Sequence, residues 1–88
     1  MSEPFRLRQD GLEWRTVEGQ ILALDTASST FFNANRTGAT LWSALQEGGT
    51  REQLAAKLVE RFDVDADTAG RDVEAFLAAL RAQGLLAE

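Results

Sequence analysis

The sequence predicts a small α+β fold in which a three-stranded antiparallel sheet is followed by three helices. Apolar and polar residues alternate in the first third of the chain, and from residue 35 onward apolar residues recur at helical spacing. The 88 residues contain no Pro- or Ser-rich linker, so we expect one domain spanning 1–88 with a small core.

The expected strands cover residues 12–17, 20–25 and 30–34. Leu12, Trp14 and Thr16 alternate on one face of the first strand, and Glu18-Gly19 supplies a two-residue turn. The second strand, Gln20–Asp25, is apolar enough to be buried on both faces, which suits the centre of the sheet.

The third expected strand, Thr30–Ala34, carries two adjacent aromatic residues. Side chains alternate along a strand, so Phe31 and Phe32 must point to opposite faces of the sheet. One ring can therefore reach the core, and the other needs a different environment. The pattern does not determine which ring is which.

Capping residues mark the three helices. Asn35 is a candidate N-cap for the first helix, which ends at Gly48-Gly49. Thr50 and Gln53 form a capping box at the start of a second helix that runs to Phe62. The third helix is expected to begin after Asp65 or Asp67, and Gly84 closes it, with Leu85 folding back on its last turn.

Residues 1–11 are ambiguous. Phe5-Arg6-Leu7-Arg8 alternates apolar and basic side chains, so the segment is expected either to be flexible or to pair as an extra strand.

The composition argues against catalysis and metal binding. The chain has no Cys and no His, which removes a disulfide, a thiolate metal site, a thiol nucleophile and the usual proton shuttle. Asp63, Asp65 and Asp67 lack the Gly and Glu of a calcium loop, and helix capping explains them. We therefore expect no enzymatic activity, no metal and no cofactor. No apolar run approaches the length of a membrane span, and the N-terminus lacks a signal-peptide core, so a cytoplasmic location is expected.

The net charge of the chain argues against anionic partners. Nine basic residues against 14 acidic ones give a net charge of −5, which disfavours binding to nucleic acid or to an anionic membrane. Helices beside a small sheet are nevertheless winged-helix-like, so a DNA-binding or regulatory domain is the alternative function. Neither the second nor the third helix presents the basic face that reading DNA requires.

Peptide binding fits the sequence better. The third strand is short, aromatic and uncharged, without the Lys or Pro that commonly protects a sheet edge. An extended peptide could add to it main chain to main chain. The competing interpretation is that both Phe residues belong to the core and the edge is simply short.

Two ordered motifs carry a resemblance to a known family. Leu24-Asp25, followed by the run from Phe31 to Trp42 (FFNANRTGATLW), and the ending from Asp72 to Leu86 (DVEAFLAAL, then GLL) resemble the signature of the PqqD-like family. With the capped second helix, the likeness extends from Leu12 to Leu86. Two positions depart from the pattern: Ala34 stands where the family usually has Leu, and Gly70 lies inside the third helix.

The resemblance implies a recognition element for ribosomally synthesised and post-translationally modified peptides (RiPPs). Such a domain adds the leader of a precursor peptide to its third strand, in a groove lined by the last helix, and delivers it to a maturation enzyme. The style of the motifs is most similar to the stand-alone leader-binding proteins of lasso-peptide clusters. There the partner is a leader peptidase, and a radical-SAM enzyme is the other possible partner.

The resemblance also assigns a peptide-binding site. Its ladder edge comprises Thr30, Phe31, Phe32 and Asn33, and its opposite wall comprises Asp72, Val73, Phe76 and Leu80. Val73 and Leu80 equally fit a purely structural core role, and Asp72 equally fits a solvated position.

Overall fold

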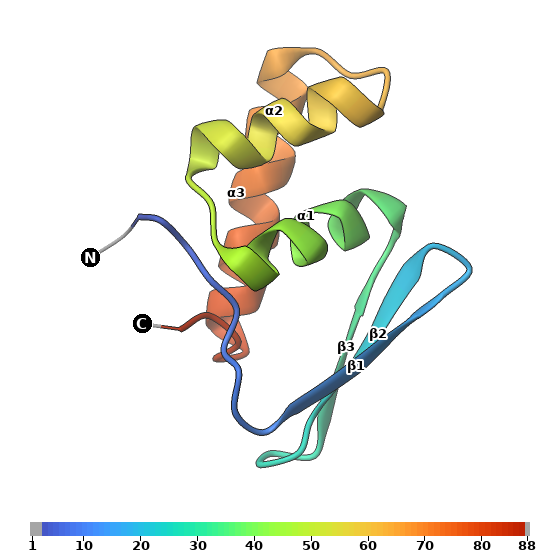
Figure 1. The fold of residues 1–88 in the computed structure, drawn as a ribbon, viewed down its shortest axis with the longest axis vertical. Helices are drawn as coiled ribbons and strands as arrows, with labels where there is room; N and C mark the ends of the chain where they lie inside the picture. Colours follow the sequence, from blue (N-terminus) through green and yellow to red (C-terminus); the bar gives the residue numbers. More distant parts are fainter. Residues whose placement is uncertain (1–2, 88) are drawn as a thin grey trace.

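The computed structural model describes residues 3–87 and has the predicted α+β architecture (Figure 1). Three strands come first: β1 (Leu12–Val17), β2 (Gln20–Asp25) and β3 (Thr30–Ala34). Three helices follow: α1 (Arg36–Glu47), α2 (Arg51–Arg61) and α3 (Ala66–Ala82). Every element lies where the sequence predicted it, which confirms the fold class.

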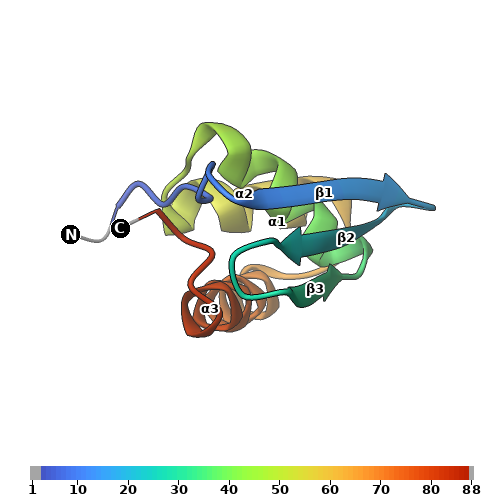
Figure 2. The same ribbon diagram turned by 90° about the horizontal axis from the view of Figure 1, so that it is seen from below.

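The strands form an antiparallel sheet in the order β1-β2-β3. β2 is the central strand, and its register pairs Thr16 with Ile21 on one side and Ile21 with Ala34 on the other. β3 therefore lies at an edge of the sheet, and in the view from below it is the strand nearest to α3 (Figure 2).

The core lies between one face of the sheet and the helices. Trp42 of α1 is fully buried there, and Ile21, Ala23 and Ala34 reach it from the sheet. Helices supply most of the remaining core through the apolar stripes predicted from the sequence: Leu41, Leu45, Leu54, Leu58, Ala69, Val73, Leu77 and Leu80.

The outer face of the sheet is open, and here one expectation was wrong. β2 was expected to be buried on both faces, but Leu22 is 37% exposed and Leu24 is only half-buried. These side chains point away from the face that carries Ile21 and Ala23, and the helices pack against that inner face. Apolar composition placed β2 at the centre correctly, but it did not reveal that only one face has a covering layer.

The helix termini follow the predicted caps. The Asn35 side chain accepts a hydrogen bond from the Gly38 amide at 2.9 Å, and Asp65, rather than Asp67, caps α3 by accepting from the Thr68 amide at 2.8 Å. The capping box of Thr50 and Gln53 is complete. These local bonds satisfy amides that a helix leaves unpaired at its start.

The N-terminal segment does not pair with β3 but bonds to the end of α1 and to the C-terminal residues. Phe5 exchanges backbone hydrogen bonds with Gly49, and the Leu7 amide donates to the Leu45 carbonyl at 3.0 Å. Leu7 also bridges to Leu86. Within residues 3–11 the segment therefore makes two isolated bridges rather than an added strand of the sheet, and its buried Phe5 and Leu7 join the core. Residues 1–2 lie outside the described part of the chain.

Arg8 connects this segment to the turn that precedes β3. Its guanidinium lies 2.8 Å from the carboxylate of the buried Asp25 and donates to the Gly84 carbonyl at 2.8 Å. Asp25 also accepts from the Ala27 amide in the loop between β2 and β3. The hydrogen bond from Arg8 holds the pKa of Asp25 below its ordinary value of 3.8, although burial alone would raise it.

We predict that the ion pair of Arg8 and Asp25 stabilises the fold at neutral pH and that this contribution is lost at acidic pH. Because the folded-state pKa of Asp25 is lowered, its contribution is present at neutral pH and is lost as pH falls from about 4 through the lowered value. Asp25→Asn should therefore melt below the wild type at pH 7, and the gap should narrow at pH 3. Thermal melting followed by circular dichroism measures both, with the exposed Asp63→Asn as a control of equal charge change. A gap of equal size at both pH values would contradict the prediction.

Candidate peptide-binding groove

A groove of about 380 Å³ separates β3 from α3. Its lining comes from β3, the start of α1 and one face of α3: Phe32, Asn33, Ala34, Asn35, Thr37, Gly38, Leu41, Asp72, Ala75, Phe76 and Ala79. One wall is thus the second half of the edge strand, and the other wall is α3.

The main chain of β3 has one unused side. Within residues 3–87, β3 pairs with β2 alone, through a register that runs from Asp25 with Thr30 to Ile21 with Ala34. Alternate residues of an antiparallel strand direct their N–H and C=O groups to opposite sides. The side turned away from β2 therefore presents donors and acceptors that a further strand could pair with.

The two aromatic residues of β3 have different roles. Phe31 is 62% exposed on the outer face, opposite Leu24. Phe32 is half-buried on the inner face, where it packs against the core and lines the groove. The interpretation in which both rings are core residues is wrong, because only Phe32 faces the core.

Phe32 forms an aromatic cluster that supports both walls of the groove. Its ring stacks on Trp42 with centroids 5.8 Å apart, and it meets Phe76 edge-on at 5.9 Å. Trp42 in turn meets Trp14 of β1 edge-on at 5.8 Å. The cluster therefore connects the sheet to α1 and α3 and fixes the position of the edge strand relative to the helix.

Gly38 allows the close approach of these elements. A Cβ at this position would lie 3.0 Å from the Ala34 Cβ and 3.0 Å from the Phe76 Cε1 atom. Both distances are shorter than ordinary van der Waals contact. The small residues Gly38 and Ala34 thus let β3, α1 and Phe76 meet at the floor of the groove, and Ala34 is itself buried.

The structure brings only part of the predicted site to the groove. Phe32, Asn33, Asp72 and Phe76 line it, whereas Thr30 and Phe31 lie on the same strand outside the lining. Val73 and Leu80 are buried in the core, so the structure places them behind the helix wall and not on it. Their helical spacing was correct, but their face of α3 packs inward.

Sequence reasoning missed the small residues of the lining. Ala75 and Ala79 lie one turn apart on α3, beside Phe76, and Gly38 forms part of the floor. Asp72, Ala75, Phe76 and Ala79 follow the i, i+3, i+4, i+7 spacing that identifies one helix face. This spacing could have identified the two alanines as part of the same helix face as Asp72 and Phe76.

The groove has one carboxylate and no cation in its described lining, since Asp72 is the charged member of the set. Its other members are apolar or carry neutral amides and hydroxyls. Among residues 3–87, no cluster of acidic side chains is arranged to hold a metal ion. None of the helices in that range has the length and apolar character of a membrane span.

An edge strand with one free side, next to a groove and a helix, is an arrangement to which an extended chain can add. The sequence profile described as "Coenzyme PQQ synthesis protein D (PqqD)" matches residues 20–86. This chain belongs to the PqqD family.

Solved structures share the whole fold. One, described as "TbiB1 in Complex with the TbiA(beta) Leader Peptide", is 27% identical, and the likeness covers 92% of this chain and 93% of that chain with a TM-score of 0.82. Another, described as "Lasso peptide synthetase B1 complexed with the leader peptide", is 25% identical over 97% of this chain and 99% of that chain, also with a TM-score of 0.82. No curated protein matches the chain.

We predict that the inner ring of β3 contributes much more to the free energy of unfolding than the outer ring does. Phe32→Ala removes a ring packed on Trp42 and Phe76 and should lower the free energy of unfolding by about 2–4 kcal/mol. Phe31→Ala removes an exposed ring and should cost less than about 1 kcal/mol. Urea unfolding measures both values. Equal losses would show that the assignment of the two faces is wrong.

A second prediction concerns the width of the groove. The added methyl group of Gly38→Ala must displace Ala34 or Phe76, and Phe76 has open groove beside it. We expect the ring to turn into the groove and weaken the binding of an added peptide at least tenfold. Gly70→Ala is the matched control, because a Cβ there has no neighbour within 4 Å. The control should bind peptide normally and gain up to about 1 kcal/mol of stability; unchanged binding by Gly38→Ala would contradict the prediction.

Proposed function

We propose that this chain is a non-catalytic adaptor that captures the leader of a ribosomally made precursor peptide. The leader adds as a fourth strand to the free edge of β3 and lies in the groove beside α3. One observation carries the proposal, namely that the open edge of β3 lies beside the α3 groove. It is supported by the two similar solved structures, which are described as complexes with leader peptides.

In an added strand, the side chains of the leader would point alternately to the two faces of the sheet. Because side chains alternate along a strand, every second leader residue would point toward Phe32, Phe76 and the small residues of α3. The intervening residues would lie on the outer face, next to Phe31. Main-chain bonds would provide affinity for any extended peptide, whereas the inward pockets would select apolar residues at alternate positions.

Asp72 gives the groove a polar contact. It is exposed on the helix wall and lies among alanines and Phe76. A leader side chain with a hydroxyl, amide or cationic donor at the matching position would bond to its carboxylate. The leader therefore combines alternating apolar anchors with one donor near Asp72.

The captured leader would be delivered to a maturation enzyme. One of the two similar structures is described as a lasso peptide synthetase, and this favours a leader peptidase over a radical-SAM enzyme as that partner. A cytoplasmic location goes with this proposal, because ribosomes release precursor peptides there. DNA binding as a winged helix is disfavoured by the net charge of −5.

We predict that a synthetic leader from a precursor encoded beside this chain binds with a Kd of about 1 µM or tighter. Calorimetric titration measures the affinity. Phe76→Ala should weaken binding at least tenfold, since it removes an apolar wall of the groove. Val59→Ala is the control, because Val59 is 44% exposed on α2 and outside the groove, and it should bind like the wild type.

Hydrogen exchange locates the added strand. Backbone amides of β3 that point away from β2 should exchange quickly in the free chain and become protected once the leader binds. An N-methyl group on a central leader residue should abolish part of this protection and weaken binding. Protection confined to α2, or binding unaffected by N-methylation, would refute strand addition.

A further inference from the structure

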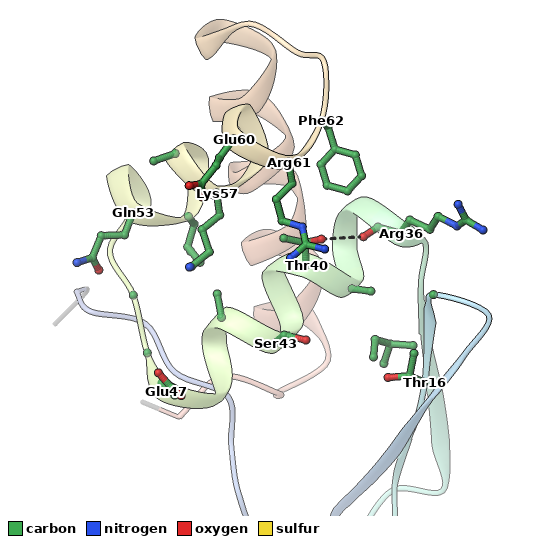
Figure 3. Close-up of a pocket in the computed structure, with 18 residues that line it drawn as sticks. Thr16, Arg36, Thr40, Ser43, Glu47, Gln53, Lys57, Glu60, Arg61 and Phe62 are labelled. Atoms are coloured by element: carbon green, nitrogen blue, oxygen red, sulfur yellow. Dashed lines mark hydrogen bonds between the residues drawn. The ribbon is translucent and has the colours of Figure 1, made fainter.

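A second and larger groove lies between α1 and α2, with a volume of about 1130 Å³ (Figure 3). Thr40, Ser43 and Glu47 face it from α1, and Lys57 and Arg61 face it from α2. The groove extends along α1 from Arg36 to Glu47, which is roughly 17 Å at the rise of an α-helix. No part of the proposed leader site lies in its lining.

The two grooves use different faces of the same helix. Thr37, Gly38 and Leu41 of α1 line the groove beside β3, whereas Arg36, Thr40, Ser43 and Glu47 line the second groove. At 100° per residue, the polar residues of the second set fall within one stripe, and Ala39 and Ala44, which also line the second groove, flank it. The two linings adjoin on α1 but share no residue.

Basic side chains gather in the second groove although the chain as a whole is acidic. The lining holds Arg36, Lys57 and Arg61 against Glu47 and Glu60, in a chain with 14 acidic and nine basic residues. Lys57 and Arg61 lie one turn apart on α2, and Figure 3 shows both side chains extending toward α1. Arg36 lies at the end of the groove, where its side chain packs beside Gly19.

None of these three cations forms a close ion pair with an acidic residue of 3–87. The ion pairs among residues 3–87 are Arg8 with Asp25 and Arg51 with Glu3 and Glu74. Arg36, Lys57 and Arg61 take part in none of them. Their charges therefore remain available to an anionic partner, which they would attract most strongly at low salt.

The floor of the groove is apolar. Ile21 and Leu54 are fully buried beneath it, and the apolar surface that a ligand can reach comes from the half-buried Phe62, Ala39 and Ala44. An apolar floor beneath a basic rim favours a segment that has both apolar and acidic side chains. It disfavours nucleic acid, whose backbone is uniformly anionic and would meet Glu47 and Glu60.

We propose that the groove between α1 and α2 docks an acidic amphipathic helix of a partner protein, about three turns long. Its apolar face would cover Phe62, Ala39 and Ala44, and its acidic side chains would pair with Lys57, Arg61 and Arg36. This assignment goes beyond the proposed function and does not depend on it, because the two sites occupy different faces of α1.

The test is an amide-shift titration of the full chain with a designed probe. The probe is a capped helical peptide of about twelve residues, with Leu on one face and Glu on the other. We expect shifts at Thr40, Ser43, Lys57 and Arg61, none in β3, and weaker binding as salt rises. Lys57→Glu/Arg61→Glu should bind the probe at least tenfold more weakly, whereas Arg15→Glu/Arg71→Glu changes the net charge equally outside both grooves and should bind normally.

Three outcomes overturn the proposal: no shifts in the groove, equal loss in the two double variants, or stronger shifts with a DNA duplex than with the peptide. Leader binding is measured on the same variants. Normal leader binding with no probe binding refutes the second groove alone, and the reverse result refutes the proposed function alone.

Discussion

An added chain can pair with the free edge of β3 only if α3 leaves room for it beside that edge. An added chain needs room for its backbone and for side chains that reach the helix wall, so a collapsed groove would exclude it and a wider one would lose the apolar contacts. The stacked rings of Phe32 and Trp42, with Phe76 edge-on, fix this separation. Ala34 and Gly38 set how closely the elements meet below it.

The N-terminal segment explains why the edge stays open. In a chain this short, any loose strand-forming segment is a competitor for an unpaired edge. Here residues 5–8 pair instead with Gly49, Leu45 and the C-terminal residues, and Phe5 and Leu7 are buried in the core. Arg8 then holds Asp25 and the loop that leads into β3. The segment thus adds Phe5 and Leu7 to the core and, through Arg8 and Asp25, contacts the loop before β3, but it does not pair with the edge of β3.

Helix α1 gives the domain two distinct surfaces. Thr37, Gly38 and Leu41 line the groove beside β3, while Arg36, Thr40, Ser43 and Glu47 line the second groove together with the basic residues of α2. The first groove carries one charged residue, Asp72, whereas the second is larger and has three basic residues around a partly apolar floor. An adaptor has to hold one partner while another approaches, and this separation of surfaces across one helix permits that.

The sequence by itself determined the elements, because strands, caps and amphipathic stripes are local patterns: Asn35, Thr50 and Asp65 cap the helices as their side chains allow. Family motifs added the idea of a groove beside β3. Only the tertiary structure decided which faces meet. A period of two places Phe31 and Phe32 on opposite faces without saying which is inside, and helical spacing groups Val73 with Leu80 without saying that this stripe packs into the core. The open outer face of β2 and the path of residues 5–8 likewise depend on contacts between segments far apart in the chain, which no local pattern encodes.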